Sequence, residues 1–584
     1  MVQQLSITPQ FDEQKRKWFF NGATEWRQDS EGTIYPPKWW DQRVYPADQE
    51  KSPDYFSQLD GDKPVPNYYA SPTARVDYAL HTEKAFDDLD LAVRFTIPID
   101  SANYGGVVFR AQNQVQAYVL GIRRTGYSPH YLCTLWLQDR YGVRYELAHA
   151  EVPHSLTADL KTHPRNYSAW TASTPDWLPI RIQTVGAFVR IRVADRIVIE
   201  KRDTTYTQGF VGLFCMGFMS FRDLSLKGTS GTLEWYGKRE EFPPFFYPGH
   251  RQLHGFNSRP MCVNSADGVT LVGWTHGHTD DRGKRIGRLL LTRSTDNAIT
   301  WEKPYAIIER EIPAQGHPPF NLISLFEHKS GEITALIRER DMGGTGGPDN
   351  VIRVHRSRDQ GKTWKVAGVF DTAGVHLYSS MVRLSNGEVL ITGYYANTVE
   401  RGDEGDDFLR LDNSVVFRSR DDGYTWGPPN CIDETNHDHN ECMFAEGQPG
   451  HLVAFMRTLM APYMWTSRSE DYGQNWTPVT QSGMGGSSTW LIKHSSGVLV
   501  MFIRDYGAHL RLSYDQGQTW TTPIFISPCC PMVGMCELND GSILIVMFEG
   551  HRIPGYIRGL KFTIEEGKII PGSDMPFREP HEQY

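Results

Sequence analysis

Glu441 and Arg457 stand sixteen residues apart in the stretch NECMFAEGQPGHLVAFMR, residues 440–457. Two apolar runs flank a Gly-Gln-Pro-Gly turn, a pattern that predicts a β-hairpin because Gly and Pro punctuate short strands. Glu441 opens the first strand and Arg457 closes the second, so both charges are predicted at the same end of the hairpin. The simpler interpretation is two solvated side chains, and the rest of the chain decides whether the pair has a function.

Arginines recur at the position of Arg457 in other hairpins of the same kind. The residues before the turn glycines are Asp267, Ser330, Asn386, Pro449, Ser496 and Asp540. Eight residues after them stand Thr275, Arg338, Tyr394, Arg457, Arg504 and Phe548, and eight before them Arg259, Leu322, Tyr378, Glu441, Ser488 and Met532. Arginines that converge in a concave site bind a carboxylate through paired hydrogen bonds. The pattern predicts a site for a small acidic ligand, most simply a sugar acid; a structural ion-pair network is the alternative.

The elements that position these residues follow from a phrase that returns five times after residue 250: STDNAITW, SRDQGKTW, SRDDGYTW, SEDYGQNW and SYDQGQTW. The copies begin 44 to 63 residues apart. In each copy Asp and Gly favour a tight turn, and the large Trp ring can pack between neighbouring units. Repeats at this period indicate a β-propeller. The six hairpins predict six blades of about four strands, the last closed by a strand near Leu233–Gly237.

The repeated phrase resembles the Asp-box of sialidase-type β-propellers, and the resemblance extends to the charged positions. FNSRPMCV, with Arg259, is similar to the first carboxylate-binding arginine motif of sialidases. Glu441 and Arg457 have the spacing of their catalytic glutamate and second arginine, and Arg504 is the best match to the third. VMFEG is similar to their final-blade motif, which implies that Glu549 orients the first arginine. Arg338 is then a fourth arginine of the site or a structural partner.

The resemblance also implies an acid/base aspartate in a loop of blade one, where GHTDDRGKRIGRLLLTRS offers Asp281, with Asp280 as its substitute. A solvated loop acid is the alternative. The sialidase nucleophile is a tyrosine of the last blade, where this chain has Met532. Tyr378 has a similar Tyr-Ser setting one blade before Glu441. Three interpretations stay open: the nucleophile has moved to Tyr378, Glu441 or another acid activates water, or sialidase chemistry is absent.

The part of the chain before the repeats has a different pattern. FDDLDLAVRFTIPID and GFVGLFCMGFMSFRDLSL alternate apolar and polar residues as strands do, and resemble strands of a concanavalin-like jelly roll. The predicted fold is therefore all-β. We expect a concanavalin-like β-sandwich over residues 1–232, a Pro-rich linker over 233–255, and a catalytic six-bladed sialidase-like β-propeller over 256–584.

Composition limits the partners. The 584 residues carry a net charge of −9 and no apolar run of membrane-helix length, which argues against nucleic acid or a membrane as partner. The start, MVQQLSITPQFDEQKRKW, lacks a signal-peptide pattern, and the eight cysteines have no regular spacing. A cytoplasmic protein with reduced thiols is expected, or a secreted one if a leader has been removed. No cofactor or metal is expected. His437 and His439 make a metal site possible, but loop histidines are more often solvated or substrate-contacting.

These observations predict an exo-acting glycoside hydrolase whose substrate is a glycan with a terminal acidic sugar. One alternative keeps the fold and makes the protein a uronic-acid glycan lyase or a non-sialic glycosidase. The other is a non-catalytic carbohydrate-binding protein. The predicted catalytic residues are Asp281, Glu441 and Tyr378, and the predicted carboxylate-binding residues are Arg259, Arg457 and Arg504.

Overall fold

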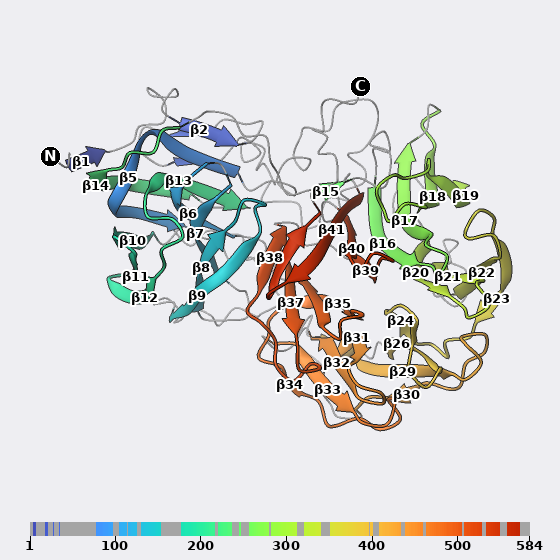
Figure 1. Cartoon of the computed structure of the whole chain (residues 1–584). Coiled ribbons are helices and arrows are strands. Elements are labelled where there is room, and N and C mark those ends of the chain that lie inside the picture. The colour runs from blue at the N-terminus through green and yellow to red at the C-terminus, as the bar shows by residue number, and fades with distance from the viewer. Residues whose placement is uncertain are drawn as a thin grey trace. The chain divides into compact units, whose positions relative to one another are not determined.

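The structure is a computed structural model of the whole chain (Figure 1). It describes residues 4–7, 18–21, 27–28, 34–35, 77–96, 104–113, 115–124, 130–153, 177–216, 220–235, 245–246, 256–279, 282–311, 320–339, 351–395, 398–400, 408–410, 412–433, 438–458, 463–504, 507–527, 533–548 and 557–572. Every regular element in these ranges is a β-strand, which confirms the all-β prediction. None of the described segments is a helix long and apolar enough to span a membrane.

The chain divides into two compact units. The first consists of Met1–Lys51, Pro66–Pro243 and Thr522–Cys529, and the second of Ser52–Val65, Pro244–Thr521 and Cys530–Tyr584. The chain passes from the first unit to the second inside the predicted linker, residues 233–255. The predicted domain limits themselves stay predictions, since most residues of that linker lie outside the described ranges.

The first unit is built from antiparallel strands around an apolar core. The long strand β5 (Asp77–Thr96) pairs with β13 through its first half and with β10 and β14 through its second. In β10, Ile180, Ile182 and Thr184 are buried while their neighbours face outward, as expected for a strand with one face on the core. The concanavalin-like topology of this unit stays a prediction. Its other strands are β1 (Gln4–Ile7), β2 (Trp18–Asn21), β3 (Arg27–Gln28), β4 (Ile34–Tyr35), β6 (Tyr104–Ala111), β7 (Ala117–Arg124), β8 (His130–Gln138), β9 (Arg144–Pro153), β10 (Leu178–Val185), β11 (Phe188–Val193), β12 (Arg196–Arg202), β13 (Gly209–Met216), β14 (Ser220–Ser230) and β38 (Ile524–Ser527).

The second unit is a β-propeller whose sheets stand around a common centre (Figure 1). Five of the six predicted blades are complete sheets of four or five strands, and the remaining one, blade five, contributes three strands to this unit. Blades one to three contain β16 (Phe256–Asn264), β17 (Thr270–Thr279), β18 (Arg285–Ser294) and β19 (Tyr305–Glu311); β20 (Phe320–Glu327), β21 (Ile333–Glu339), β22 (Val351–Ser357) and β23 (Lys365–Phe370); and β24 (His376–Leu377), β25 (Val382–Arg383), β26 (Val389–Tyr395), β29 (Asn413–Ser419) and β30 (Asn430–Cys431).

Blades four to six complete the ring, and a small two-stranded sheet lies in the loop after β26. Blade four contains β31 (Asn440–Glu446), β32 (Leu452–Arg457), β33 (Trp465–Ser469) and β34 (Thr480–Gln481); blade five contains β35 (Ser487–Lys493), β36 (Leu499–Arg504) and β37 (Ala508–Ser513); blade six contains β15 (Phe245–Phe246), β39 (Val533–Glu537), β40 (Ile543–Phe548), β41 (Ile557–Glu565) and β42 (Lys568–Pro571). The small sheet pairs β27 (Thr398–Glu400) with β28 (Phe408–Arg410). The next strand in the sequence after β37 is β38. It belongs to the first unit and pairs there with β9.

The six predicted hairpins are all present, and their turn glycines have φ between 77° and 89°. In the first hairpin the amide of Ser265 donates to the carbonyl of Val269 at 2.9 Å, and the amide of Gly268 donates back to Ser265 at 2.9 Å. Every later hairpin has the first of these bonds, and all but the fourth have the second. Glycine is favoured at this position because its lack of a Cβ makes positive φ inexpensive.

The Asp-boxes stabilise the turns that follow the third strands. In the second copy, Asp359 accepts hydrogen bonds from the Ser357 hydroxyl at 2.7 Å and the Thr363 amide at 2.8 Å. Although burial opposes the charge, these bonds lower the pKa of Asp359 to about 2. In the fourth copy Asn475 takes the place of threonine, and its side-chain amide donates from Nδ2 to Asp471 Oδ2 at 2.6 Å. The five phrases are therefore turn-stabilising devices, as their composition predicts.

The ring closes through a different strand from the one predicted. Phe245 and Phe246 form β15, which pairs with β41 in blade six. The expected segment near Leu233–Gly237 is not a strand over its described residues, 233–235. It packs in the first unit instead, where the rings of Trp235 and Phe210 meet edge to face at 5.1 Å. The prediction was wrong because tertiary packing of this tryptophan decides which nearby segment is free to pair.

Candidate active site

The inner strands of blades one, two, four and five carry a β-bulge at equivalent places. The pairing register shifts between Ser258 and Met261, between Leu322 and Ser324, between Asn440 and Met443, and between Ser487 and Trp490. In blade three the amides of Tyr378 and Ser379 both donate to the carbonyl of Thr392, at 3.0 and 3.4 Å. A bulge bends its strand and redirects a side chain, so the repeated fold supplies a ring of redirected positions.

Three bulge residues have a left-handed backbone that glycine would normally occupy. Their φ angles are 48° for Arg259, 45° for Glu441 and 49° for Ser488. This conformation costs about 1–2 kcal/mol for a residue with a Cβ. Such strain gathers at functional sites, where the surroundings hold a side chain in a required direction.

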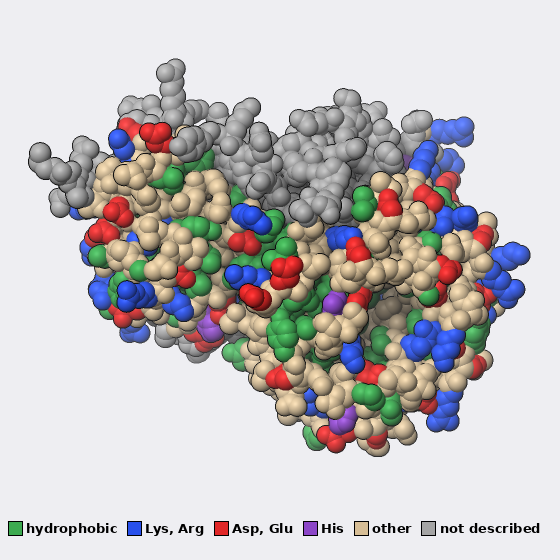
Figure 2. Space-filling model, viewed as in Figure 1, with side chains coloured by type: hydrophobic (Ala, Val, Ile, Leu, Met, Phe, Trp, Pro, Cys, Tyr) green, Lys and Arg blue, Asp and Glu red, His purple; other side chains and the backbone are tan. Residues whose placement is uncertain are grey.

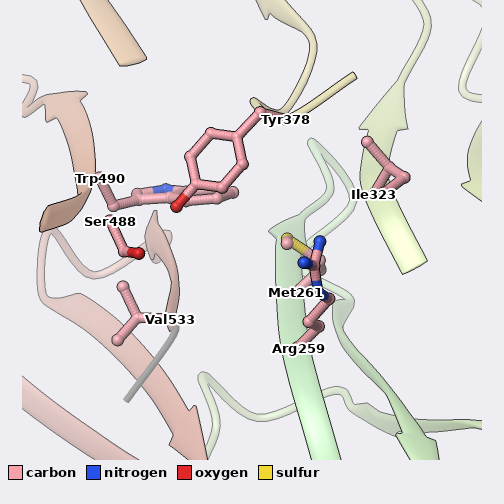
Figure 3. A pocket seen from close by; sticks show the side chains of 7 residues that line it. All are labelled: Arg259, Met261, Ile323, Tyr378, Ser488, Trp490 and Val533. Atoms are coloured by element: carbon pink, nitrogen blue, oxygen red, sulfur yellow. The ribbon is translucent and has the colours of Figure 1, made fainter. Parts of the chain in front are cut away.

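A pocket of about 320 Å³, counted with its open mouth, lies among these bulges. The propeller is visibly hollowed near its centre in Figure 2. Figure 3 shows Arg259 and Met261 on one side of the pocket, facing the side that carries Tyr378, Ser488 and Trp490. The apolar side chains of Ile323 and Val533 complete the lining.

The Glu441 carboxylate is held by one residue at each oxygen. Arg457 donates from Nη1 to Oε1 at 2.9 Å, and Ser488 donates from Oγ to Oε2 at 3.0 Å. The Glu441 side chain is 9 % exposed and that of Arg457 is 27 % exposed. Burial opposes the Arg457 charge, but the neighbouring carboxylate outweighs it, so the pKa of Arg457 is raised. Glu441 is therefore an oriented carboxylate whose charge is compensated at one oxygen.

Tyr378 is the phenol of the pocket. Burial raises its pKa above the ordinary value of 10, and the charge of Glu441 adds to this effect. A hydrogen bond with Ser488 and the charges of Arg504 and Arg259 act in the opposite direction. The phenol is thus protonated at neutral pH and lies within electrostatic reach of one predicted acid and two predicted arginines.

Arg259 and Arg504 have no carboxylate partner in the part of the chain that the structure describes. The guanidinium of Arg504 donates from Nε to Ser487 Oγ at 3.2 Å, while its buried Nη1 has no hydrogen-bond partner. Arg259 faces the pocket beside Met261 (Figure 3). A guanidinium that is partly buried without an anion is costly, so these two favour binding of an anionic ligand.

Arg338 has a structural contact. It is 5 % exposed, and its Nη2 donates to the carbonyl of Leu377, which ties blade two to blade three. It also lies near Tyr394, whose pKa burial raises and whose neighbours include Glu441. Of the two roles predicted for Arg338, this contact favours the structural partner.

A buried polar cluster behind Glu441 was missed by the sequence prediction. The Asn440 amide donates to Asp412 Oδ2 at 2.7 Å, and both residues are nearly inaccessible to solvent. His439 is fully buried, and its Nδ1 accepts a hydrogen bond from the Ser414 amide at 3.1 Å. The interpretation of His439 as solvated or substrate-contacting was therefore wrong. Nothing in the sequence around Asp412 signals this contact, because only the fold brings the residue before β29 next to the first residue of β31.

Ser488 and Trp490 also belong to the pocket without having been predicted as site residues. Ser488 did occupy the inner register that yields Arg259, Tyr378 and Glu441, and that position was the available signal. In blade two the bulge moves the pocket position by one residue, so Ile323 lines the pocket while Leu322 is buried.

Several predicted residues lie outside the described ranges. These are Asp281, its substitute Asp280, Glu549, Met532 and His437. Their proposed roles stay predictions. Among the described residues no group of three or more metal-ligating side chains is present.

The comparison with family models agrees with a repeat-built second unit. Residues 274–489 match the BNR repeat-like domain family. No curated protein matches the chain. Among solved structures, the NanB sialidase of Streptococcus pneumoniae is 13 % identical, with 82 % of this chain and 95 % of that chain covered and a TM-score of 0.44. A leech intramolecular trans-sialidase is 12 % identical over 82 % and 95 % at 0.42, and an α-L-arabinanase of Penicillium chrysogenum is 14 % identical over 53 % and 96 % at 0.37.

Proposed function

Because its second unit is a BNR-repeat propeller of the sialidase-like Asp-box family, we propose that this protein is an exo-acting glycoside hydrolase for a terminal acidic sugar. One observation supports it most. Arg259, Tyr378 and Ser488 line one pocket, Ser488 donates to the buried carboxylate of Glu441, and the charge of Arg504 acts on the Tyr378 phenol. The remaining steps concern what each group does to a bound sugar acid.

Arg259 and Arg504 hold the carboxylate of the substrate. Each brings a planar guanidinium whose geometry matches a carboxylate, and neither has a carboxylate partner among the described residues. Arg457 is already paired with Glu441 at 2.9 Å, so its contribution to the ligand is shared with that contact. The pocket therefore selects for an anionic sugar through desolvated positive charge, and a neutral sugar leaves that charge uncompensated.

Tyr378 is the nucleophile and Glu441 its base. A neutral phenol as nucleophile avoids bringing a second negative charge to the anionic sugar, and tyrosine nucleophiles are an established exception among glycosidases. The raised pKa of Tyr378 means that the phenol needs a base at neutral pH. Glu441 is the nearby carboxylate for that purpose. Asp281, in the loop that follows β17, is the proposed acid for the leaving oxygen.

The bond changes follow from these roles. The Tyr378 oxygen forms a bond to the anomeric carbon as the bond to the leaving oxygen breaks. The phenolic proton moves toward Glu441, and the Asp281 proton goes to the leaving oxygen. Water then attacks the anomeric carbon, returns the phenol and restores the starting protonation. Two displacements at one carbon retain its configuration.

A second candidate is an eliminating enzyme for uronic-acid glycans. Arginines that neutralise a carboxylate also acidify the neighbouring C–H, and Tyr378 with Glu441 can remove that proton. Arg259 and Arg504 fit this chemistry equally well.

The test is a screen of the full-length protein against aryl glycosides of sialic acids and of uronic acids. We expect release of the aryl group from an acidic sugar and none from the matched neutral sugar. Release that gives an unsaturated, ultraviolet-absorbing sugar identifies the eliminating enzyme. Tight glycan binding on a broad panel with no release of any aryl group argues for the carbohydrate-binding alternative.

A further inference from the structure

Both carboxylate oxygens of Glu441 already accept a hydrogen bond from a neighbouring side chain. Arg457 occupies Oε1 at 2.9 Å, and the Ser488 hydroxyl occupies Oε2 at 3.0 Å. The influence of Glu441 on the phenol is through space, whereas the Ser488 and Tyr378 side chains line the same pocket beside each other (Figure 3). A proton that leaves Tyr378 for Glu441 therefore has Ser488 in its path.

The hydroxyl of Ser488 has a forced direction. A serine hydroxyl has one proton to donate and two lone pairs that accept. Since an ionised carboxylate only accepts, the Ser488 proton points to Glu441 and its lone pairs are left for the phenol. Tyr378 must then be the donor in its contact with Ser488. Figure 3 shows the Tyr378 and Ser488 oxygens on the same side of the pocket, both directed into the space between them.

The position of the Ser488 side chain is fixed by burial and by an unusual backbone conformation. Ser488 is 3 % exposed and has a φ of 49° at the bulge of β35, so its hydroxyl is turned away from the regular strand direction. It comes from blade five, whereas Tyr378 comes from blade three and Glu441 from blade four. Three neighbouring blades thus each supply one of these three side chains.

We propose that Ser488 relays the proton from Tyr378 to Glu441. This inference rests on the proposed function and names a residue beyond it. As the Tyr378 oxygen bonds to the anomeric carbon, its proton passes to Ser488 Oγ, and the Ser488 proton passes to Glu441 Oε2. The leaving oxygen takes its proton from Asp281. Ser488 begins and ends as a neutral hydroxyl, and no electrons are exchanged.

The first arm of the test is kinetic and uses the substrate that the wild-type protein turns over. In Ser488→Ala the alanine keeps the backbone conformation and the Cβ of Ser488 but lacks the hydroxyl. We expect kcat to fall by about 100-fold with little change in KM. Ser488→Gly relieves the backbone and leaves room for a water molecule in place of the hydroxyl, so we expect a partial return of kcat. Ser467→Ala removes a buried hydroxyl of blade four that bonds Thr477, and should leave the kinetics unchanged.

The second arm needs no turnover. A fluorinated tyrosine at position 378, whose ring titrates at lower pH than tyrosine, is followed by ¹⁹F NMR in the full chain. Once the phenol is ionised, Ser488 can turn its proton to the phenolate, so its loss in Ser488→Ala should move the titration up by about one pH unit. An unchanged titration together with an unchanged kcat overturns the relay. If no glycoside is turned over while the titration still moves, the proposed function fails and the Tyr378–Ser488 link stands.

Discussion

Arg457 and Glu441 form an ion pair of 2.9 Å between the two inner strands of one blade. The pairing register sets Asn440 against Arg457, and the bulge that follows turns Glu441 toward it. The same strand end in blade five carries Arg504, but the bulge residue there is Ser488, which brings no charge. Equivalent positions of two blades therefore hold one paired and one unpaired arginine, and the two are expected to respond differently to substitution.

Glu441→Gln should abolish turnover and leave the fold intact. Glutamine has nearly the same shape and can still contact Ser488 and Arg457, but it cannot take up a proton. We expect kcat to fall by about 1,000-fold or more, within the range of general acid–base contributions. Glu470→Gln, at an exposed glutamate of the Asp-box in the same blade, is the matched control. A Glu441→Gln variant with wild-type activity would remove the glutamate from the mechanism.

Arg504→Met and Arg457→Met should change stability in opposite directions. Methionine at position 504 removes a partly buried charge that has no carboxylate partner among the described residues, so we expect the free energy of unfolding to stay the same or rise by about 1 kcal/mol. Methionine at position 457 leaves the Glu441 carboxylate without its partner, and we expect a loss of about 2–3 kcal/mol, because the pair is only partly exposed. Urea unfolding of the three proteins measures both values.

Both arginine variants should bind acidic sugars more weakly. For Arg504→Met we expect KM for an acidic aryl glycoside to rise at least about tenfold, as a charged hydrogen bond is worth roughly 1.5–3 kcal/mol. The hydrolysis of a neutral analogue, if any is measurable, should not fall in parallel. Equal losses of stability in the two variants would mean that Arg504 has a structural anion partner, and would count against the carboxylate clamp.

The fold was largely predictable because its signals are local. Each Asp-box holds its own turn through bonds such as Ser357 to Asp359, and each hairpin turn needs a glycine at positive φ. The two partners of each bond are only a few residues apart in the sequence, so the repeated phrase itself predicts the bond. The closing strand was not predictable in this way. Whether a segment near residue 235 or near residue 245 pairs with β41 depends on a distant contact, that of Trp235 with Phe210.

The site was predictable as a ring of positions and not as a set of contacts. Counting from the turns identified Arg259, Tyr378 and Glu441, because every blade repeats the same geometry. It could not show that Glu441 pairs with Arg457 while Arg504 is unpaired, since that difference comes from bulges and from the neighbour in the next blade. The shift from Leu322 to Ile323 at the pocket has the same cause.

Asp359→Asn should destabilise the propeller without touching the chemistry. Asp359 accepts hydrogen bonds from Ser357 and Thr363, and its pKa in the folded state is about 2, below the ordinary 3.8. A lowered folded pKa gives stability that is complete above pH 3.8 and is lost as pH falls to about 2. We expect a loss of roughly 1 kcal/mol at pH 7, kept small by solvation, which shrinks below pH 4.

Urea unfolding at pH 7 and at two values below pH 4 measures this difference. Asp195→Asn, at an exposed aspartate of the other unit, is the control and should show no comparable change. Turnover per folded molecule should be unchanged in Asp359→Asn. A difference that stays constant down to pH 2 would mean that the charge of Asp359 contributes nothing to the turn.

His276→Gln should make the propeller less sensitive to mild acid. His276 is 1 % exposed in β17, and its pKa is lowered to about 3, mainly by burial and then by the nearby charges of His278 and Arg288. The unfolded chain has the ordinary value of 6.5. Between pH 6.5 and about 3 unfolding therefore takes up a proton, so stability falls with falling pH by up to about 1.4 kcal/mol per pH unit from this group. Glutamine removes that proton uptake, and the stability of the variant should decline less steeply from pH 7 to pH 4.5.

His451→Gln, at an exposed histidine, should keep the wild-type slope. Parallel curves for His276→Gln and the wild type would show that His276 protonates without cost in the folded state, and that its burial is not maintained in solution.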